Sequence, residues 1–185
     1  MSPILGIYAS SQQATKFSYR SIATQTVGSG GASSISFTSI PSTYTHLQIR
    51  GIYRSNRAST ADNVGMQFNG DTATNYSSHE LYANGTSATA SSDVSIAQIY
   101  AARASAASIG ANIFGGGVID ILDYANTNKY KTTRSLSGFD DNSTNGQVWF
   151  ESGNWRNTAA INSITLFAAN GNLTQYSSFA LYGVN

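Results

Sequence analysis

The sequence predicts an all-β protein, an antiparallel β-sandwich of jelly-roll topology preceded by an extended N-terminal arm. Short runs of alternating apolar and polar residues recur from Ser33 onward, separated by clusters of Gly, Asn, Asp and Ser. Ser, Thr, Asn and Gly supply 79 of the 185 residues, and these types favour turns and loops over helix interiors. The chain has only two prolines and no long helical period, and its length suits one domain.

Residues 1–30 are predicted to form an arm and a flexible link, and residues 31–185 the sandwich domain. An apolar segment near the start is followed by a polar stretch that ends at Gly28–Gly31. Because this segment has no evident place in its own core, we expect it to anchor the subunit on a neighbour's sheet edge or groove. The alternatives are a disordered tail and a first strand of the same sandwich. The predicted anchor residues are Ile4, Leu5, Ile7 and Tyr8.

The first half of the domain is predicted to hold strands that end at turn-forming residues. Alternation with serines before an Ile-Pro pair indicates one strand, and residues 45–53 indicate the next, with Leu47 and Ile49 on one face. Two later runs stop at the Asn-Gly pairs 69–70 and 84–85. The apolar face of the run before the first pair comprises Val64, Met66 and Phe68.

The clearest predicted hairpin joins residues 113–124 to residues 129–139. The first run is apolar on both faces apart from Asp120 and Asp123, which is typical of a central strand. Since buried carboxylates need partners, Arg134 or Lys131 on the paired strand is expected to supply a structural ion pair. Residues 95–111, in contrast, mix helical and irregular spacing, and we expect a strand start followed by a loop.

Three further strands are expected in the C-terminal third, which brings the total to about nine. Within residues 147–155, Val148 and Phe150 are predicted to point inward and Trp149 outward. Residues 161–168 and 177–184 follow, separated by an Asn-Gly loop. The apolar residues expected to face the core from these last two strands are Ile164, Leu166, Phe179 and Leu181.

Composition argues against several classes of partner. The formal net charge is +1 and only 10% of residues are charged, so no strong field draws nucleic acid or an anionic membrane. Low charge also offers little electrostatic protection against self-association, which suits a protein that works in an assembly. No apolar run is long enough to insert into a membrane, the start lacks the pattern of a signal peptide, and there is no cysteine.

The sequence holds no motif for catalysis, a cofactor or a metal, and we expect a non-enzymatic protein. His46 and His79 are isolated, and no Gly-x-Ser-x-Gly elbow accompanies the many serines. The loop 140–146 offers several oxygen ligands, but it lacks the EF-hand positions. A solvated hairpin loop is therefore the preferred interpretation, with calcium binding as the alternative.

The eleven tyrosines and two tryptophans provide amphipathic rings of the kind that interfaces use. Most are expected in the core or on strand faces. The rings proposed to contact a glycan or another subunit are Trp149, Trp155, Tyr53 and Tyr82.

Four strings resemble a family of small β-sandwich virion proteins of tailed bacteriophages, found among tail-fibre, spike and capsid-auxiliary components. The strings are Ser2–Ser11, Ser36–Arg50, Ile121–Lys131 and Tyr176–Gly183. The resemblance implies a subunit of an appendage that is anchored by its N-terminal segment, with the sandwich projecting outward. A capsid decoration or head-fibre protein and a carbohydrate-binding receptor-recognition module are the alternatives.

The same resemblance implies the partners and the location. The chain is expected to bind other virion proteins, to form a homo-oligomer, commonly a trimer, and in the receptor-binding alternative to contact a host surface glycan. Its expected location is the virion, which is assembled in the host cytoplasm. Position on the particle does not follow from fold alone.

Overall fold

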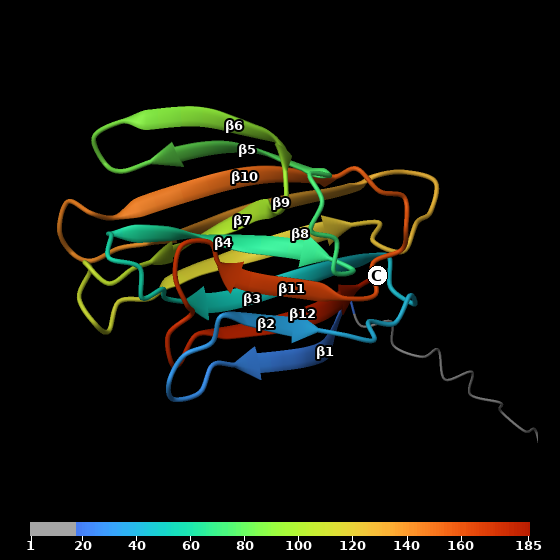
Figure 1. The fold of residues 1–185 in the computed structure, drawn as a ribbon, viewed down its shortest axis with the longest axis horizontal. Helices are drawn as coiled ribbons and strands as arrows, with labels where there is room; N and C mark the ends of the chain where they lie inside the picture. Colours follow the sequence, from blue (N-terminus) through green and yellow to red (C-terminus); the bar gives the residue numbers. More distant parts are fainter. Residues whose placement is uncertain (1–17) are drawn as a thin grey trace, which may run out of the picture.

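The computed structural model describes residues 18–185, and every regular element in that range is a β-strand (Figure 1). Alternating side chains and Asn, Gly and Ser turns produce twelve strands, against about nine expected from the sequence. The strands are β1 (Tyr19–Thr26), β2 (Ser34–Phe37), β3 (His46–Tyr53), β4 (Ala61–Phe68), β5 (Tyr76–Ala83), β6 (Ala88–Ile96), β7 (Ile99–Ser105), β8 (Gly115–Leu122), β9 (Lys131–Phe139), β10 (Gln147–Trp155), β11 (Ile164–Ala168) and β12 (Ser178–Val184).

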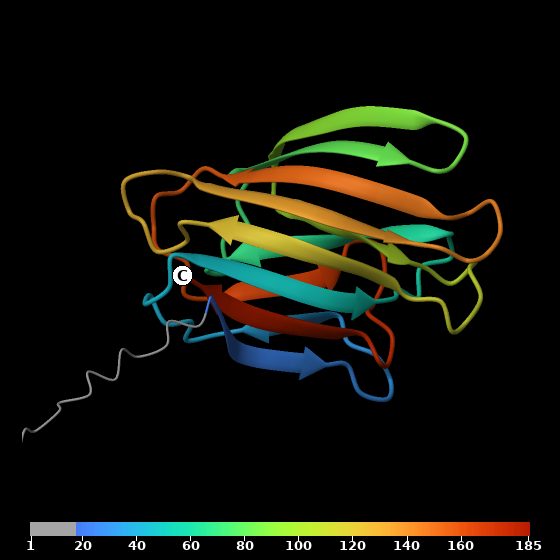
Figure 2. The same cartoon turned by 180° about the vertical axis from the view of Figure 1, so that it is seen from behind.

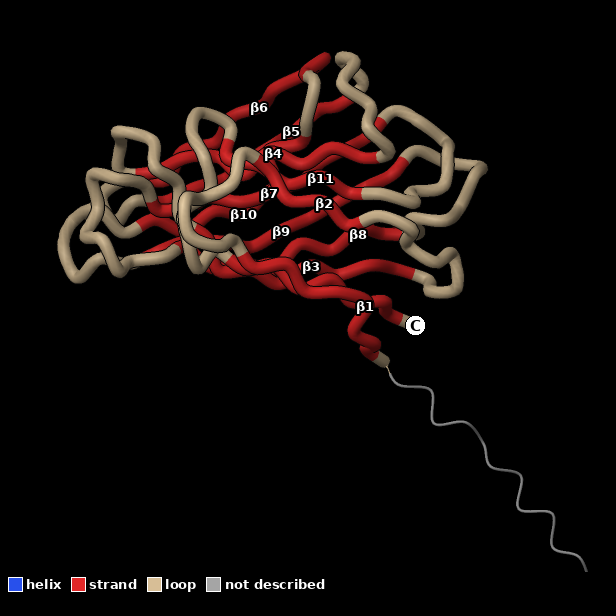
Figure 3. Tube along the Cα trace, turned by 60° about the horizontal axis from the view of Figure 1, so that its bottom comes forward, coloured by secondary structure: helices blue, strands red, loops and turns tan. Residues whose placement is uncertain are grey.

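Two antiparallel sheets pack face to face as a β-sandwich, which confirms the predicted fold class at that level (Figures 1 and 2). The large sheet has the order β1-β12-β3-β8-β9-β10-β5-β6, and the small sheet has the order β2-β11-β4-β7. Pairings are nested along the chain: β1 pairs with β12, β2 with β11, β3 with β8, β4 with β7 and β5 with β6. Connecting loops gather at the two ends of the sandwich (Figure 3).

The core lies between the sheets and is lined as the alternation predicts. Val64, Met66 and Phe68 on β4 are fully buried, and β4 ends at the Asn69–Gly70 turn, where both residues have positive φ. The predicted hairpin is confirmed, since β8 pairs antiparallel with β9. The other residues expected inward that are buried are Leu47, Ile49, Ile164, Leu166, Phe179 and Leu181.

The first described strand alters the expected division at residue 30. Tyr19–Thr26 forms β1 and pairs with β12 at one edge of the large sheet. This stretch of the predicted arm is therefore a strand of the sandwich, because its backbone groups find partners in the C-terminal strand. The anchor residues Ile4, Leu5, Ile7 and Tyr8 lie outside the described residues.

Two local expectations were wrong. Residues 88–105 form β6 and β7, separated by a short bend, where a strand start followed by a loop was expected over residues 95–111. On β10, Trp149 is 4% exposed while Val148 and Phe150 are 51% and 54% exposed, which reverses the predicted facing. The side of the sheet that meets the second sheet is decided by tertiary packing, and alternation alone leaves the choice open.

No helix long and apolar enough to cross a membrane occurs between residues 18 and 185.

Candidate functional site

The outer face of the large sheet, which points away from the small sheet, carries a continuous row of apolar side chains. Strand register places Val118, Leu136, Phe150 and Leu81 directly opposite one another across β8, β9, β10 and β5. Their exposed fractions are 36%, 56%, 54% and 53%. Directly opposed side chains on one face contact each other, so the row is one surface and not four isolated residues.

A second apolar row runs beside the first, two residues along each strand. It begins at Ile52 on β3, crosses Gly116 and Gly138, and continues through Val148 and Ala83. Ile52 is 57% exposed. The two rows together form what we call the apolar outer face: Val118, Leu136, Phe150, Leu81, Ile52 and Val148. Contiguous exposed patches of this kind mark interaction sites far more often than scattered apolar residues do.

The other half of the same face is polar and bonded to itself. Gln48 donates from Nε2 to Asp120 Oδ1 at 2.8 Å, and Arg134 donates from Nε to Asp120 Oδ2 at 3.2 Å. The ion pair expected for Asp120 is confirmed. Asp123, at the end of β8, pairs with Lys129 and accepts no contact from Arg134. The apolar outer face is therefore bounded on one side by a hydrogen-bonded polar border.

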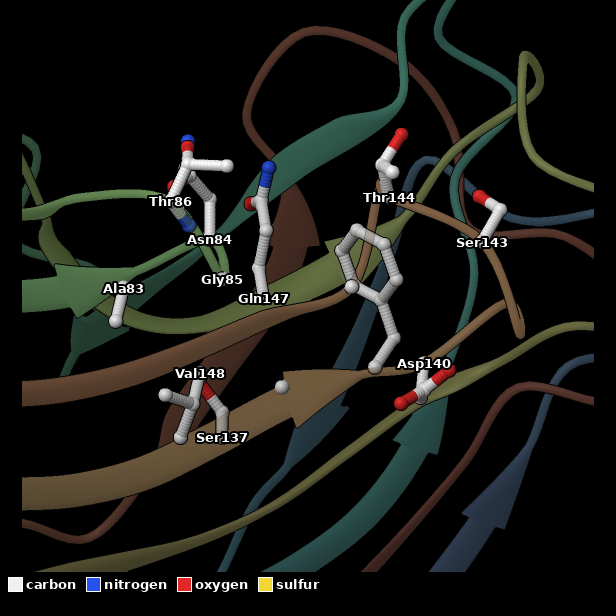
Figure 4. A pocket seen from close by; sticks show the side chains of 13 residues that line it. Ala83, Asn84, Gly85, Thr86, Ser137, Asp140, Ser143, Thr144, Gln147 and Val148 are labelled. Atoms are coloured by element: carbon white, nitrogen blue, oxygen red, sulfur yellow. Dashed lines mark hydrogen bonds between the residues drawn. The ribbon is translucent and has the colours of Figure 1, made fainter.

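An open cavity of about 810 Å³ lies at the end of the sheet, where two hairpin loops meet (Figure 4). The turn Asn84–Thr86 borders one side, and Ser143 and Thr144 border the other, with Gln147 between them. Val148 and Ala83, both from the second apolar row, also line the cavity. The cavity thus continues the apolar outer face into a region of amide and hydroxyl groups.

The loop 140–146, considered above for calcium, is held by its own side chains. Asp141 accepts hydrogen bonds from Ser143 and Asn145, and these bonds hold the pKa of its carboxyl below the usual range. Asp140 accepts from the backbone N–H of Asn142 at 2.7 Å. Such Asx bonding is typical of a tight solvated loop. Among residues 18–185, no group of three or more His, Cys, Asp and Glu side chains is placed to hold a metal.

Two of the four aromatic residues proposed for contacts stack on each other, and a third is buried elsewhere in the core. Trp149 and Tyr82 occupy opposed positions on β10 and β5, and their rings stack at 4.3 Å. The guanidinium of Arg103, from β7, lies 4.3 Å from the Trp149 ring centre. Tyr53 is 1% exposed and stacks on Phe179. Burial of Trp149 and Tyr53 removes them from contact with a glycan, because the small sheet covers them.

Trp155 is likewise a core residue. It is 1% exposed, packs against Phe68 at 5.5 Å between ring centres, and donates from Nε1 to Asp71 Oδ2 at 2.8 Å. The hydrogen bond satisfies the polar end of a ring that is otherwise in apolar surroundings. Tyr82 is the proposed contact residue that keeps part of its side chain exposed.

A buried carboxyl group, which the sequence did not single out, lies beside the Trp149 stack. Glu151 is 2% exposed and stands between Ser135 and Glu80 on the neighbouring strands. Burial and the nearby Glu80 raise the pKa of Glu151 to about 8, although Ser135 and Arg103 act in the opposite direction. The carboxyl is therefore mostly protonated near neutral pH. The only sequence signal was a charged residue in an alternating strand.

The remaining singled-out residues have structural roles. His46 Nδ1 accepts from the backbone N–H of Asp123 at 2.9 Å, and His79 lies in the polar half of the outer face, opposite Ser152. Lys131 is fully buried, and its Nζ donates to the carbonyls of Asn126, Lys129 and Thr158. Lys131 thus stabilises the loop before β9 by donating to carbonyl groups, and it does not supply the expected ion pair with a carboxylate.

No protein-family model, curated protein or solved structure matches the chain. Function must be inferred from the residues and their geometry. The buried polar groups and the loop bonds serve the fold itself, whereas the apolar outer face has no cover among residues 18–185.

Proposed function

We propose that this chain is a non-enzymatic structural subunit of a tailed-bacteriophage virion, which assembles through its apolar outer face. The observation that carries the proposal is that face: six large apolar side chains in two adjacent rows on a sheet with no cover among residues 18–185. Burial of the exposed half of each such side chain contributes roughly 1 kcal/mol or more to the free energy of association. The phage assignment rests on the four resembling strings.

The finer parts of the proposal concern topology and placement. The nested strand pairs suit a jelly roll, in which the chain folds back on itself as a long hairpin wrapped into two sheets. We assign the subunit to a tail-fibre or spike-like appendage, as a homotrimer anchored by Ile4, Leu5, Ile7 and Tyr8. A capsid decoration or head-fibre protein would use the same surface.

Low charge favours this surface as a subunit contact. The polar half of the outer face is already paired within itself, through Gln48, Asp120 and Arg134. Arg50 lies opposite Val118 and donates from Nε to Gln48 Oε1 at 2.8 Å. A partner that covers the apolar half therefore meets a guanidinium that is already hydrogen-bonded. The overall charge of +1 adds almost no repulsion between copies.

The test is a pair of matched double variants on the same face. Leu136→Asp with Phe150→Asp places two carboxylates in the centre of the apolar outer face and should reduce the oligomer to a smaller species in sedimentation velocity. The control, Thr132→Asp with Ser152→Asp, changes exposed positions in the polar half of the same two strands and should leave the oligomer intact. A wild-type chain that stays monomeric at high concentration would refute assembly through this face.

Particle membership requires its own measurement. The proposal expects the chain in purified particles of the phage that encodes it, detected by mass spectrometry and located by immunogold labelling. Deletion of residues 1–17 should abolish incorporation while the purified domain remains folded. Normal incorporation of the truncated chain would exclude the anchor.

A second candidate function, recognition of a neutral host glycan, is favoured by the cavity between the hairpin loops. Its border combines the amides of Asn84 and Gln147 and the Asp140 carboxylate with apolar Val148, a combination suited to sugar hydroxyls and ring carbons. A glycan array probed with the intact chain tests it. Binding that is lost in Gln147→Ala supports the assignment, and an array without signal rejects it.

A further inference from the structure

The free edge of β6 is a second surface that the proposed assembly does not use. β6 is the last strand of the large sheet, and among residues 18–185 it pairs with β5 alone. In Figure 1 the β5–β6 hairpin lies at the rim, beyond the strands of the small sheet. Most of β6 is exposed, with Val94 at 68%. An edge of this length offers a row of backbone donors and acceptors to another strand.

Between Ala88 and Val94, β6 has few of the features that normally protect an edge: its register shift against β5 falls at Ser95, after this stretch, and Asp93 is its one inward-facing charge. Its sequence, Ala-Thr-Ala-Ser-Ser-Asp-Val-Ser-Ile, contains no Lys, Arg or Pro and one charged residue, Asp93. The opposite edge of the sheet differs, since β1 carries Arg20 and its register shift, between Ser21 and Ala23, lies inside the strand. Irregularity and charge of this kind discourage pairing. Of the two edges of the large sheet, β6 is the one open to a partner strand.

The hydrogen-bond alternation shows which residues of β6 face outward. At the hairpin turn the backbone N–H of Asn84 donates to the carbonyl of Ser87, so Asn84 and Ser87 form a hydrogen-bonded pair between β5 and β6. Bonded and non-bonded pairs alternate in an antiparallel ladder, which makes Ala83–Ala88 and Leu81–Ala90 non-bonded pairs. The backbone N–H and C=O groups at positions 88, 90, 92 and 94 therefore point to the free edge. Ser95, with φ of 54°, ends this regular stretch.

We propose that β6 pairs antiparallel with β6 of a second copy, around a two-fold axis at Ser91. In this register the edge-facing residues meet as Ala88 with Val94 and Ala90 with Ser92, so every outward group from 88 to 94 is bonded. Thr89 lies opposite Asp93 and provides a hydroxyl donor to that carboxylate.

This register also keeps the two Asp93 carboxylates apart and gives Val94 a contact on the outer side of the sheet. The two Asp93 side chains stand four residues apart along the strands, about 13 Å, so they are largely screened from each other. Val94, which is 68% exposed in the single chain, packs on Ala88 of the partner on the outer side of the sheet. A heterologous contact of β6 with β1 of another copy would have to accommodate the irregularity of β1.

This contact is separate from the apolar outer face, and cysteine cross-linking tests it directly. The chain has no cysteine, so each variant carries a single thiol. Ser91→Cys places the thiol opposite its own copy in a non-bonded pair, where Cα atoms lie about 4.5 Å apart, within the range of a disulfide. The full-length variant should form a disulfide-linked dimer on mild oxidation, seen in non-reducing gels.

Matched controls fix the register. Thr89→Cys lies on the same strand and face, yet its thiol is opposite Asp93, so it should stay unlinked. Ser92→Pro removes an outward N–H without touching a bond to β5, and added to Ser91→Cys it should abolish the cross-link while circular dichroism stays native. The cross-link should persist in Leu136→Asp with Phe150→Asp, which disrupts only the outer face.

Failure of Ser91→Cys to link, or equal linking by Thr89→Cys, overturns the two-fold edge pairing. Linking by Ser92→Cys in preference to Ser91→Cys overturns the register. Neither result affects the outer-face proposal, because that contact is scored by sedimentation of its own variants.

Discussion

At the scale of single residues, the interior of this sandwich contains polar groups with incomplete bonding. Among the described residues, the buried side-chain atoms without a hydrogen-bond partner are Tyr53 OH, Arg103 Nε and Glu151 Oε1. Unpaired buried groups of this kind cost about 1–3 kcal/mol each in a folded protein. Near Trp149 the two sheets meet through the Arg103 guanidinium of β7, which lies over the Trp149 ring, and not through a closed polar network.

Glu151 should make stability depend on pH. Below its ordinary pKa of 4.5 the carboxyl is protonated in both folded and unfolded chains, but between 4.5 and about 8 only the folded chain holds the proton. The free energy of unfolding should therefore fall as pH rises through this range and level off above it. Glu151→Gln, which cannot ionise, should flatten the curve and stabilise the protein at pH 9 by roughly 1–3 kcal/mol.

Urea unfolding of both chains from pH 4 to pH 9 measures this effect. The difference between the two curves isolates Glu151 from the other titrating groups. A difference that does not change with pH would show that the carboxyl is ionised in the folded state at neutral pH.

Lys131 should be far more important to stability than its neighbour Lys129. Lys131→Met fills the same space but leaves the carbonyls of Asn126, Lys129 and Thr158 without their donor, at a cost of about 3 kcal/mol. Lys129→Met removes a surface pair with Asp123 and should cost under about 1 kcal/mol. Chemical denaturation checks both values, and equal losses would contradict the role assigned to Lys131.

At the scale of elements, β1 divides the arm that the sequence predicts over residues 1–30, because Tyr19–Thr26 belong to the sandwich. Ile22 and Ala23 pack on the core, and Arg50 lies over the Tyr19 ring at 5.2 Å. Residues 19–26 therefore contribute to the fold, and the proposed anchor residues precede them. A truncation that is meant to test attachment must leave β1 in place.

Deletion of residues 1–26 should accordingly lower the free energy of unfolding by about 2–4 kcal/mol, since it removes a paired strand and its buried side chains. Deletion of residues 1–17 should leave it within about 0.5 kcal/mol of the full chain. Thermal and urea denaturation compare the three chains. Equal stability of the longer truncation would show that the β1–β12 pairing is dispensable.

At the scale of the whole molecule, the first and last described strands pair in the large sheet. β12 lies between β1 and β3, so the last strand completes the sheet that the first strands begin. Pairings between distant segments close long loops, which makes such folds slow to form. The native sheet cannot be completed before the C-terminal residues are available.

Removal of residues 178–185 should therefore abolish cooperative folding. The deletion leaves β1 and β3 without a common neighbour and removes Phe179 and Leu181 from the core. Circular dichroism during thermal unfolding provides the measurement. A sharp transition in the truncated chain would mean that the rest of the sandwich folds without β12.

Sequence reasoning succeeded where local chemistry decides the outcome. Turn residues such as Asn69–Gly70 end strands because they tolerate positive φ, and the β8–β9 hairpin follows from a central apolar strand beside an alternating one. The same reasoning failed for Trp149, because either face of an alternating strand can be the buried one. It missed β6, whose small polar residues have no strong period and gain their order from pairing with β5.

The apolar outer face, like the facing of Trp149, does not follow from spacing along the chain. Val118, Leu136, Phe150 and Leu81 come from four strands, and no spacing along the chain indicates that they lie in one row. Register across the sheet, fixed by backbone hydrogen bonds between distant segments, brought them together. Residue type alone predicts surface contacts for Tyr53, Trp149 and Trp155, but their burial depends on the second sheet.

By itself the sequence determined the composition of this protein and the local structure that follows from it: an all-β chain with low charge and strands bounded by Asn, Gly and Ser. Periodicity and turn chemistry act over a few neighbouring residues, so both can be recognised directly in the sequence. Only the tertiary structure decided which face of each strand is buried, which residues form the apolar outer face, and which strand is left as an open edge. These are properties of the pairing between segments far apart in the chain, and packing of one sheet on the other sets them.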